Sequence, residues 1–295
     1  PSSKTRIGPL VAAHRSLITS LKKYSFEFIA IIVQIINFDS STHTVHDFPK
    51  YYKVVCYKYS MNTSLPEKKR TAFTILLYIG ISLFLGKMIV LYGPSFPIIT
   101  DSLKYIEIAT SITNGEYAAI KGIIYPPGYP AFLAIVYTLL NTSAATIFAV
   151  HFLLLSGIAS LTFLIAQRFF NIRYSLSLLA GLTILVWPYM ILYSILIMSE
   201  VVYIFFLLSS LYLFLAACTT KTKRSFAYAG VIIGITTLIR PITLLLPFWF
   251  IGLYILWHLY KKKSLHLYKE IGIGIALFTI TPLPWSLYMY ANTGV

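Results

Sequence analysis

The chain has 295 residues, of which 58% are hydrophobic and only 11% are charged, and its mean hydropathy is +0.77. This composition excludes a soluble globular domain and predicts an all-α, polytopic bundle of transmembrane helices. The formal net charge of +15 would indicate a nucleic-acid partner in a soluble protein, but no basic helix or aromatic-interleaved patch resembles a nucleic-acid groove. The positive-inside rule, under which Lys and Arg gather in cytoplasmic loops, explains the charge better.

Residues 1–70 differ from the rest of the chain, because they carry eleven Lys/Arg and four Asp/Glu and only one apolar run. That run, residues 28–38, is shorter than the roughly 20 residues that a membrane span needs. We predict a basic, partly disordered cytoplasmic extension here, with a mistranslated upstream segment as the alternative. The second predicted domain, residues 71–295, is transmembrane. The chain starts at Pro1 rather than Met and ends in an aromatic stretch that looks unfinished, so we expect a fragment at both ends, with the transmembrane domain truncated at its C-terminus.

Seven apolar segments are interpreted as membrane spans: residues 71–92, 144–166, 175–198, 201–217, 226–239, 242–260 and 271–290. Trp187-Pro188 predicts a kink in the third of them. Another apolar run, residues 131–140, is short, and we expect it to lie at the outer surface or to dip in. This count leaves the N-terminus inside and the C-terminus outside.

The predicted topology has an internal check in the distribution of charge. Each basic cluster falls on the cytoplasmic side, namely residues 67–70, 168–173, 221–224 and 261–263. Asp101, Glu200 and Arg240 all fall on the opposite side.

The first external loop, residues 93–143, contains one long polar interval, Thr100–Pro130. Five residues in it are spaced by three and four and would share one helix face: Asp101, Lys104, Tyr105, Ile108 and Ala109. Asn114-Gly115 predicts the end of this helix. The three prolines within residues 126–130 predict a rigid, non-helical return towards the bilayer. Because long ordered loops between spans usually carry a function, this interval is the candidate site.

Three charged residues at predicted membrane boundaries are candidates for chemistry, since charge there is costly and tends to be functional. Asp101 suits either a helix cap or an acid that takes a proton. Glu200 suits either the start of a helix, where the dipole favours it, or a site. Arg240 is either a snorkelling boundary arginine or a ligand for phosphate. Together they fit transfer chemistry on a lipid phosphate, with an acid for the nucleophile's proton and a cation for the leaving group.

The order of these motifs along residues 71–295 carries a resemblance. The matching pieces are residues 101–109 with 114–117, 125–130, 199–200, 234–241, and Pro284-Trp285 with Tyr290 and Gly294. They resemble the GT-C superfamily of polyprenyl-phosphate-sugar-dependent glycosyltransferases. The branch they are most similar to includes protein O-mannosyltransferases and the aminoarabinose and lipopolysaccharide sugar transferases.

The resemblance implies a multi-pass membrane enzyme that takes its sugar from undecaprenyl- or dolichyl-phosphate. It would transfer that sugar, with inversion, to a lipid, glycan or protein acceptor at the extracytoplasmic face of a bacterial or archaeal plasma membrane or of the ER membrane. Asp101 would be the catalytic residue and Arg240 the ligand of the donor phosphate. Supporting residues would be Glu200, Lys104, Tyr105, Glu107 and Tyr129.

One departure from the family pattern bears on the mechanism. Ser102 stands where many relatives have a second acid, which argues against paired carboxylates. No cofactor is implied with certainty. A divalent metal stays open, because one acid in each of two loops offers an ion few ligands.

The alternative is a non-enzymatic transporter or lipid flippase. Transporters often contain internal repeats and broken helices with charge at the membrane midplane. We find no repeat here, and the charges lie at the ends of the predicted spans. Both observations favour the enzyme.

The topology predicts the accessibility of two loops. In a background without native cysteines, Asn114→Cys should react with an impermeant maleimide added to intact cells. Lys223→Cys should react only after permeabilisation, because positive loops stay in the cytoplasm. Labelling of position 223 from outside would overturn the topology.

Overall fold

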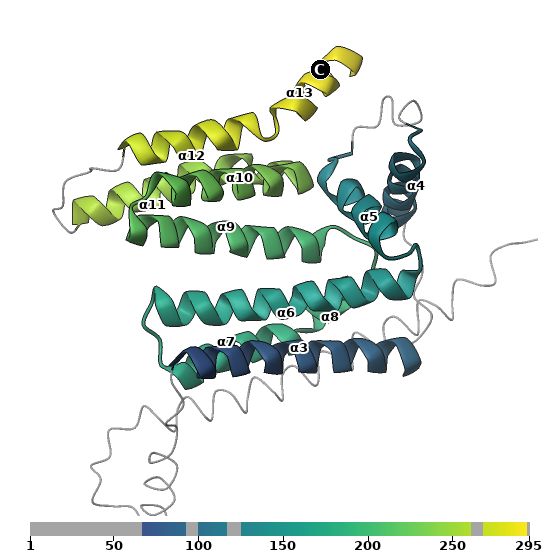
Figure 1. Ribbon diagram of the computed structural model, residues 1–295, viewed down its shortest axis with the longest axis horizontal. Helices are drawn as coiled ribbons and strands as arrows, with labels where there is room; N and C mark the ends of the chain where they lie inside the picture. Colours follow the sequence, from purple (N-terminus) through teal and green to yellow (C-terminus); the bar gives the residue numbers. More distant parts are fainter. Residues whose placement is uncertain (1–66, 93–99, 117–124, 261–267, 294–295) are drawn as a thin grey trace, which may run out of the picture. The chain divides into compact units, whose positions relative to one another are not determined.

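The computed structural model describes residues 67–92, 100–116, 125–260 and 268–293 (Figure 1). The chain divides into two units, residues 1–74 with 186–188 and residues 75–185 with 189–295. The site and the contacts reported below belong to the second unit. The basic extension predicted for residues 1–70 lies, up to residue 66, outside the described residues.

All regular elements in the described ranges are helical, which confirms the predicted all-α class. They are α3 (Glu67–Tyr92), α4 (Thr100–Asn114), α5 (Gly128–Leu139), α6 (Ala144–Arg168), α7 (Tyr174–Val186), α8 (Pro188–Ser194), α9 (Glu200–Thr220), α10 (Lys223–Ile239), the 3₁₀ helix η3 (Pro241–Leu245), α11 (Leu246–Tyr260), α12 (Tyr268–Ile280) and α13 (Leu283–Thr293).

Four described helical segments are long and apolar enough to cross a membrane: Glu67–Leu91, Ala144–Arg168, Glu200–Thr220 and Lys269–Ala291. A fifth span results if α7 and α8, which meet at a bend of 53°, are counted as one. The bend lies at Trp187-Pro188, as predicted, since proline removes a helical donor and disfavours helix in the residue before it. The other predicted spans, α10 and η3 with α11, are shorter, so the count of seven stays a prediction.

The helix predicted in the polar interval is present as α4, and Gly115 ends it with φ +73°. The five residues predicted to share one face of this helix differ in burial. Ser102, Ile108 and Ala109 are buried, whereas Asp101 and Lys104 are exposed. The buried face is therefore centred on Ser102, Tyr105 and Ala109, and the two charged side chains border it.

The proline-rich segment is shorter than predicted, because α5 begins at Gly128 and includes Tyr129 and Pro130. Pro130 lies in the first helical turn, where backbone N–H groups have no acceptor within the helix, so its lack of an N–H removes no helical hydrogen bond. The prediction of a non-helical segment was wrong for these three residues. The apolar run 131–140 falls almost entirely within α5, which is a short apolar helix, and its position at the outer surface or dipping into the membrane stays a prediction.

Small residues let α10 approach α12 closely. A Cβ at Gly230 would collide with the carbonyl of Gly274, and one at Gly234 would lie 2.5 Å from Cβ of Thr281. Close packing at small residues is how helices associate in a lipid environment. α10 also packs along α9, and α5 contacts both α4 and α10.

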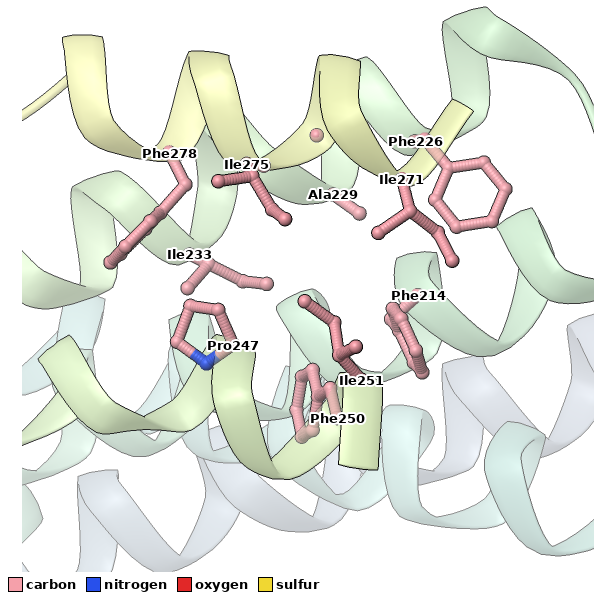
Figure 2. Close-up of a pocket in the computed structure, with 12 residues that line it drawn as sticks. Phe214, Phe226, Ala229, Ile233, Pro247, Phe250, Ile251, Ile271, Ile275 and Phe278 are labelled. Atoms are coloured by element: carbon pink, nitrogen blue, oxygen red, sulfur yellow. The ribbon is translucent and has the colours of Figure 1, made fainter. Parts of the chain in front are cut away.

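An apolar hollow lies among α9, α10, α11 and α12 (Figure 2). Phe214, Ile233, Phe250 and Phe278 are among the side chains that line it. None of the described residues in its lining is charged.

Candidate active site

The candidate site is built where α9 begins and α10 ends. Arg240 directly follows α10, and its backbone is extended, with φ −142° and ψ 115°. Pro241 accounts for this conformation, because a proline pushes the preceding residue out of the helical region. The chain then continues as η3 with Pro241 at its start. The break therefore projects Arg240 from the end of α10 rather than along its side.

The first turn of α9 holds the guanidinium of Arg240. Its Nε donates to Oγ of Ser199 at 3.1 Å, and its Nη2 donates to Oε1 of Glu200. The carbon Cζ lies 5.5 Å from the ring centroid of Tyr203, within the range of a cation–π contact. Because positions 199, 200 and 203 lie within one turn of each other, a single turn supplies all three contacts.

These contacts leave part of the guanidinium available. Nε and Nη2 form one edge of the planar group, and the second edge is formed by Nη1 and Nη2. The Arg240 side chain is 37% exposed, whereas that of Glu200 is 16% exposed. The N–H groups of the second edge can therefore donate to the two oxygens of another ligand without displacing Glu200.

Tyr105 connects the surroundings of the arginine to α4. It forms a hydrogen bond with Ser199, and its ring meets that of Tyr129 edge-on, with centroids 4.9 Å apart. Burial raises the pKa of the Tyr105 phenol; the bond to Ser199 lowers this pKa, Asp101 and Glu200 raise it, and Arg240 lowers it. The phenol thus lies in the electrostatic range of both acids and of the arginine.

Asp101 lies at the solvent-exposed start of α4. The hydroxyl of Tyr125 donates to its Oδ1 at 3.4 Å, and the ring of Tyr125 packs edge-on against Tyr105 at 5.7 Å. Asp101 is consequently accessible to a substrate on the same side of the molecule as Tyr105.

Tyr129 and Gly128 fix the start of α5 beside the site. Tyr129 is fully buried, and its hydroxyl lies 3.4 Å from Nε2 of His151 on α6. Gly128 is even more constrained, because a Cβ there would lie 2.7 Å from the backbone N of Ile239 and C of Leu238. The start of α5 is thus pressed against the residues that immediately precede Arg240.

The structure brings five of the seven predicted site residues into this arrangement: Asp101, Tyr105, Tyr129, Glu200 and Arg240. Lys104 and Glu107 instead form an exposed ion pair with each other, 3.6 Å apart on α4. Ser199, Tyr203 and Tyr125 were not among the predicted site residues, although the pieces that carry the resemblance include Ser199 and Tyr125. The spacing of Ser199, Glu200 and Tyr203 places them on one face of a helix and would have revealed two of them.

The described residues contain no group of three or more His, Cys, Asp or Glu side chains placed to hold a metal ion. In that part of the chain, the polar groups around Arg240 are mostly hydroxyls, with Glu200 as the paired carboxylate. The arrangement is suited to holding an anion.

The fold and this site describe a membrane protein with a partly exposed arginine at the end of one of its helices. A family model described as dolichyl-phosphate-mannose-protein mannosyltransferase matches residues 125–285, more than half of the chain. The chain belongs to this family, which is part of the GT-C superfamily. It is therefore an integral membrane glycosyltransferase of the mannosyltransferase type that uses a polyprenyl-phosphate-linked sugar.

The match includes Tyr125, Tyr129, Glu200 and Arg240, whereas Asp101 and the rest of α4 lie outside it. Comparisons with curated proteins and with solved structures returned no match.

The close approach of Gly128 to α10 predicts the effect of a single methyl group. Gly128→Ala should force the backbone at Leu238 and Ile239 to shift and so displace Arg240. We expect the KM for polyprenyl-phosphate mannose to rise about tenfold, because misplacement of a binding group by a fraction of an ångström is costly. Gly80→Ala is the control, since a Cβ there meets nothing within 4 Å. An unchanged donor KM in Gly128→Ala would show that this contact does not position the arginine.

Proposed function

We propose that the protein transfers a sugar, with inversion, from its polyprenyl-phosphate donor to an acceptor at the extracytoplasmic face of the membrane. The observation that carries the proposal is the guanidinium of Arg240, fixed on one edge by Ser199 and Glu200 and available on the other. A planar donor edge of this kind matches two oxygens of a phosphate. The basic clusters at residues 168–173 and 221–224 lie at the C-terminal ends of α6 and α9, whereas the site lies where α9 begins. This arrangement supports the extracytoplasmic face for the site, because basic loops stay in the cytoplasm.

Asp101 is the proposed general base. It is exposed, it lies on the side of Tyr105, and the Tyr125 hydroxyl holds one of its oxygens, which leaves the other for an acceptor hydroxyl. An acid in this position can take the proton as the acceptor oxygen becomes nucleophilic.

The proposed step balances in atoms and charge. The acceptor oxygen forms a bond to the anomeric carbon from the face opposite the phosphate, and its proton passes to Asp101. The bond from that carbon to the phosphate oxygen breaks, and its electron pair stays on the phosphate. The products are the inverted glycoside and a polyprenyl phosphate, whose added negative charge Arg240 stabilises through its N–H groups.

The remaining residues have supporting roles in this proposal. Tyr105 and Tyr129 align α4 and α5 over the arginine, and Glu200 holds the guanidinium. Lys104 and Glu107 lie on the exposed side of α4, where an acceptor would approach. The acceptor is a lipid, a glycan or a protein with a free hydroxyl, and the step as written requires no divalent metal.

Two substitutions at Asp101 separate catalysis from a structural role in the first turn of α4. Asp101→Asn keeps the size of the side chain but cannot take up a proton, so the protein should insert normally while transfer falls about 10²–10⁴-fold. Asp101 is the second residue of α4, so if it only stabilises the start of the helix, Asp101→Asn and Asp101→Ala should each lose about 0.3–1 kcal/mol of stability and keep near-normal transfer.

The measurement is radiolabelled sugar transfer from polyprenyl-phosphate mannose to a membrane extract. Protein amount and size-exclusion profile serve as the controls for folding. Near-normal turnover by a well-folded Asp101→Asn protein would remove Asp101 from the mechanism.

A further inference from the structure

Glu200 is an unusual partner for an arginine that binds an anion. Its side chain is only 16% exposed, and while Oε1 accepts from Arg240, Oε2 is buried without a hydrogen-bond partner in the described structure. A buried, half-satisfied carboxylate is costly for folding. Holding the guanidinium alone would not require a charge, because a neutral oxygen acceptor could accept the same hydrogen bond.

The contact geometry keeps Glu200 in place when an anion binds. Ser199 and Glu200 occupy the edge formed by Nε and Nη2. A phosphate on the edge formed by Nη1 and Nη2 would therefore bind beside the pair rather than in place of the carboxylate. The phosphate would then experience an arginine whose charge is largely balanced by Glu200 a few ångströms away.

The charge of the lipid changes during the reaction. The donor is a phosphodiester with a single negative charge, whereas the phosphate monoester left after transfer is close to doubly charged above its second pKa of about 6. A fixed negative charge beside the site weakens binding of the product more than binding of the donor.

We propose that Glu200 is a positioning residue that orients Arg240 for the donor and, by balancing its charge, limits how tightly the site retains the polyprenyl phosphate product. The inference rests on the proposed function for the identity of that product. It explains why the acceptor for Arg240 is charged, which the hydrogen bond to Arg240 alone does not explain.

The test uses a matched pair of probes, farnesyl phosphate and its methyl ester, which share one lipid chain and differ in charge. Their binding to the purified full chain in detergent is measured at pH 8 by calorimetry. Glu200→Gln retains an oxygen that can accept from Arg240 but removes the charge. We expect this variant to bind farnesyl phosphate about tenfold more tightly and the methyl ester only about threefold more tightly.

Two further variants separate charge from position. Ser199→Ala removes the partner of Nε without changing the charge, so both probes should weaken by the same factor. Glu270→Gln removes an equal charge in the first turn of α12 and should leave both affinities unchanged. Equal or weaker binding of farnesyl phosphate by Glu200→Gln would overturn the inference.

The wild-type protein gives a second test that does not depend on the folding of any variant. With the arginine charge balanced, the two probes should bind with dissociation constants within about threefold of each other. A preference of more than about tenfold for farnesyl phosphate would also overturn the inference. These binding measurements are independent of sugar transfer. If the wild-type protein transfers sugar but does not show the expected binding, this inference alone is refuted. If it shows the expected binding but transfers no sugar, only the proposed reaction step is refuted.

Discussion

The structure of the site depends on one contact, between the guanidinium of Arg240 and the first turn of α9. It connects the end of α10 to Ser199 and Glu200 across about 40 residues of chain. Because the Glu200 side chain is mostly buried, removal of Arg240 would leave its carboxylate without the partner that compensates its charge. Gly128 presses the start of α5 against the same end of α10, and Tyr105 reaches Ser199 from α4. Four helices thus converge on one arginine.

This arrangement places chemistry at helix ends and leaves the helices apolar between them. Small residues on α10 bring its backbone close to α12, and the hollow among α9 to α12 has no charged lining. Charge in the middle of these helices would be costly in lipid, whereas at their ends water and hydrogen-bond partners are within reach. A membrane glycosyltransferase needs such a division, because its donor has an apolar chain and an anionic head.

Much of the fold followed from the sequence, because hydrophobic length and proline have strong, local effects. The long helices, the bend at Trp187-Pro188 and the end of α4 at Gly115 were all predictable. The pairing of Glu200 with Arg240 was not, since spacing within one segment says nothing about which helix ends meet. The exposed pair of Lys104 and Glu107 shows a related limit, because spacing within α4 does not tell which of its charged side chains reach the site and which pair with each other.

The central claim is that Arg240 holds the donor phosphate through its planar fork. Steady-state transfer from polyprenyl-phosphate mannose by Arg240→Ala and Arg240→Lys tests it most directly. The account predicts that Arg240→Ala raises the donor KM about 100-fold and Arg240→Lys about tenfold, because lysine keeps the charge but not the bidentate geometry. A folded Arg240→Ala protein with the donor KM and turnover of the wild type would contradict the account.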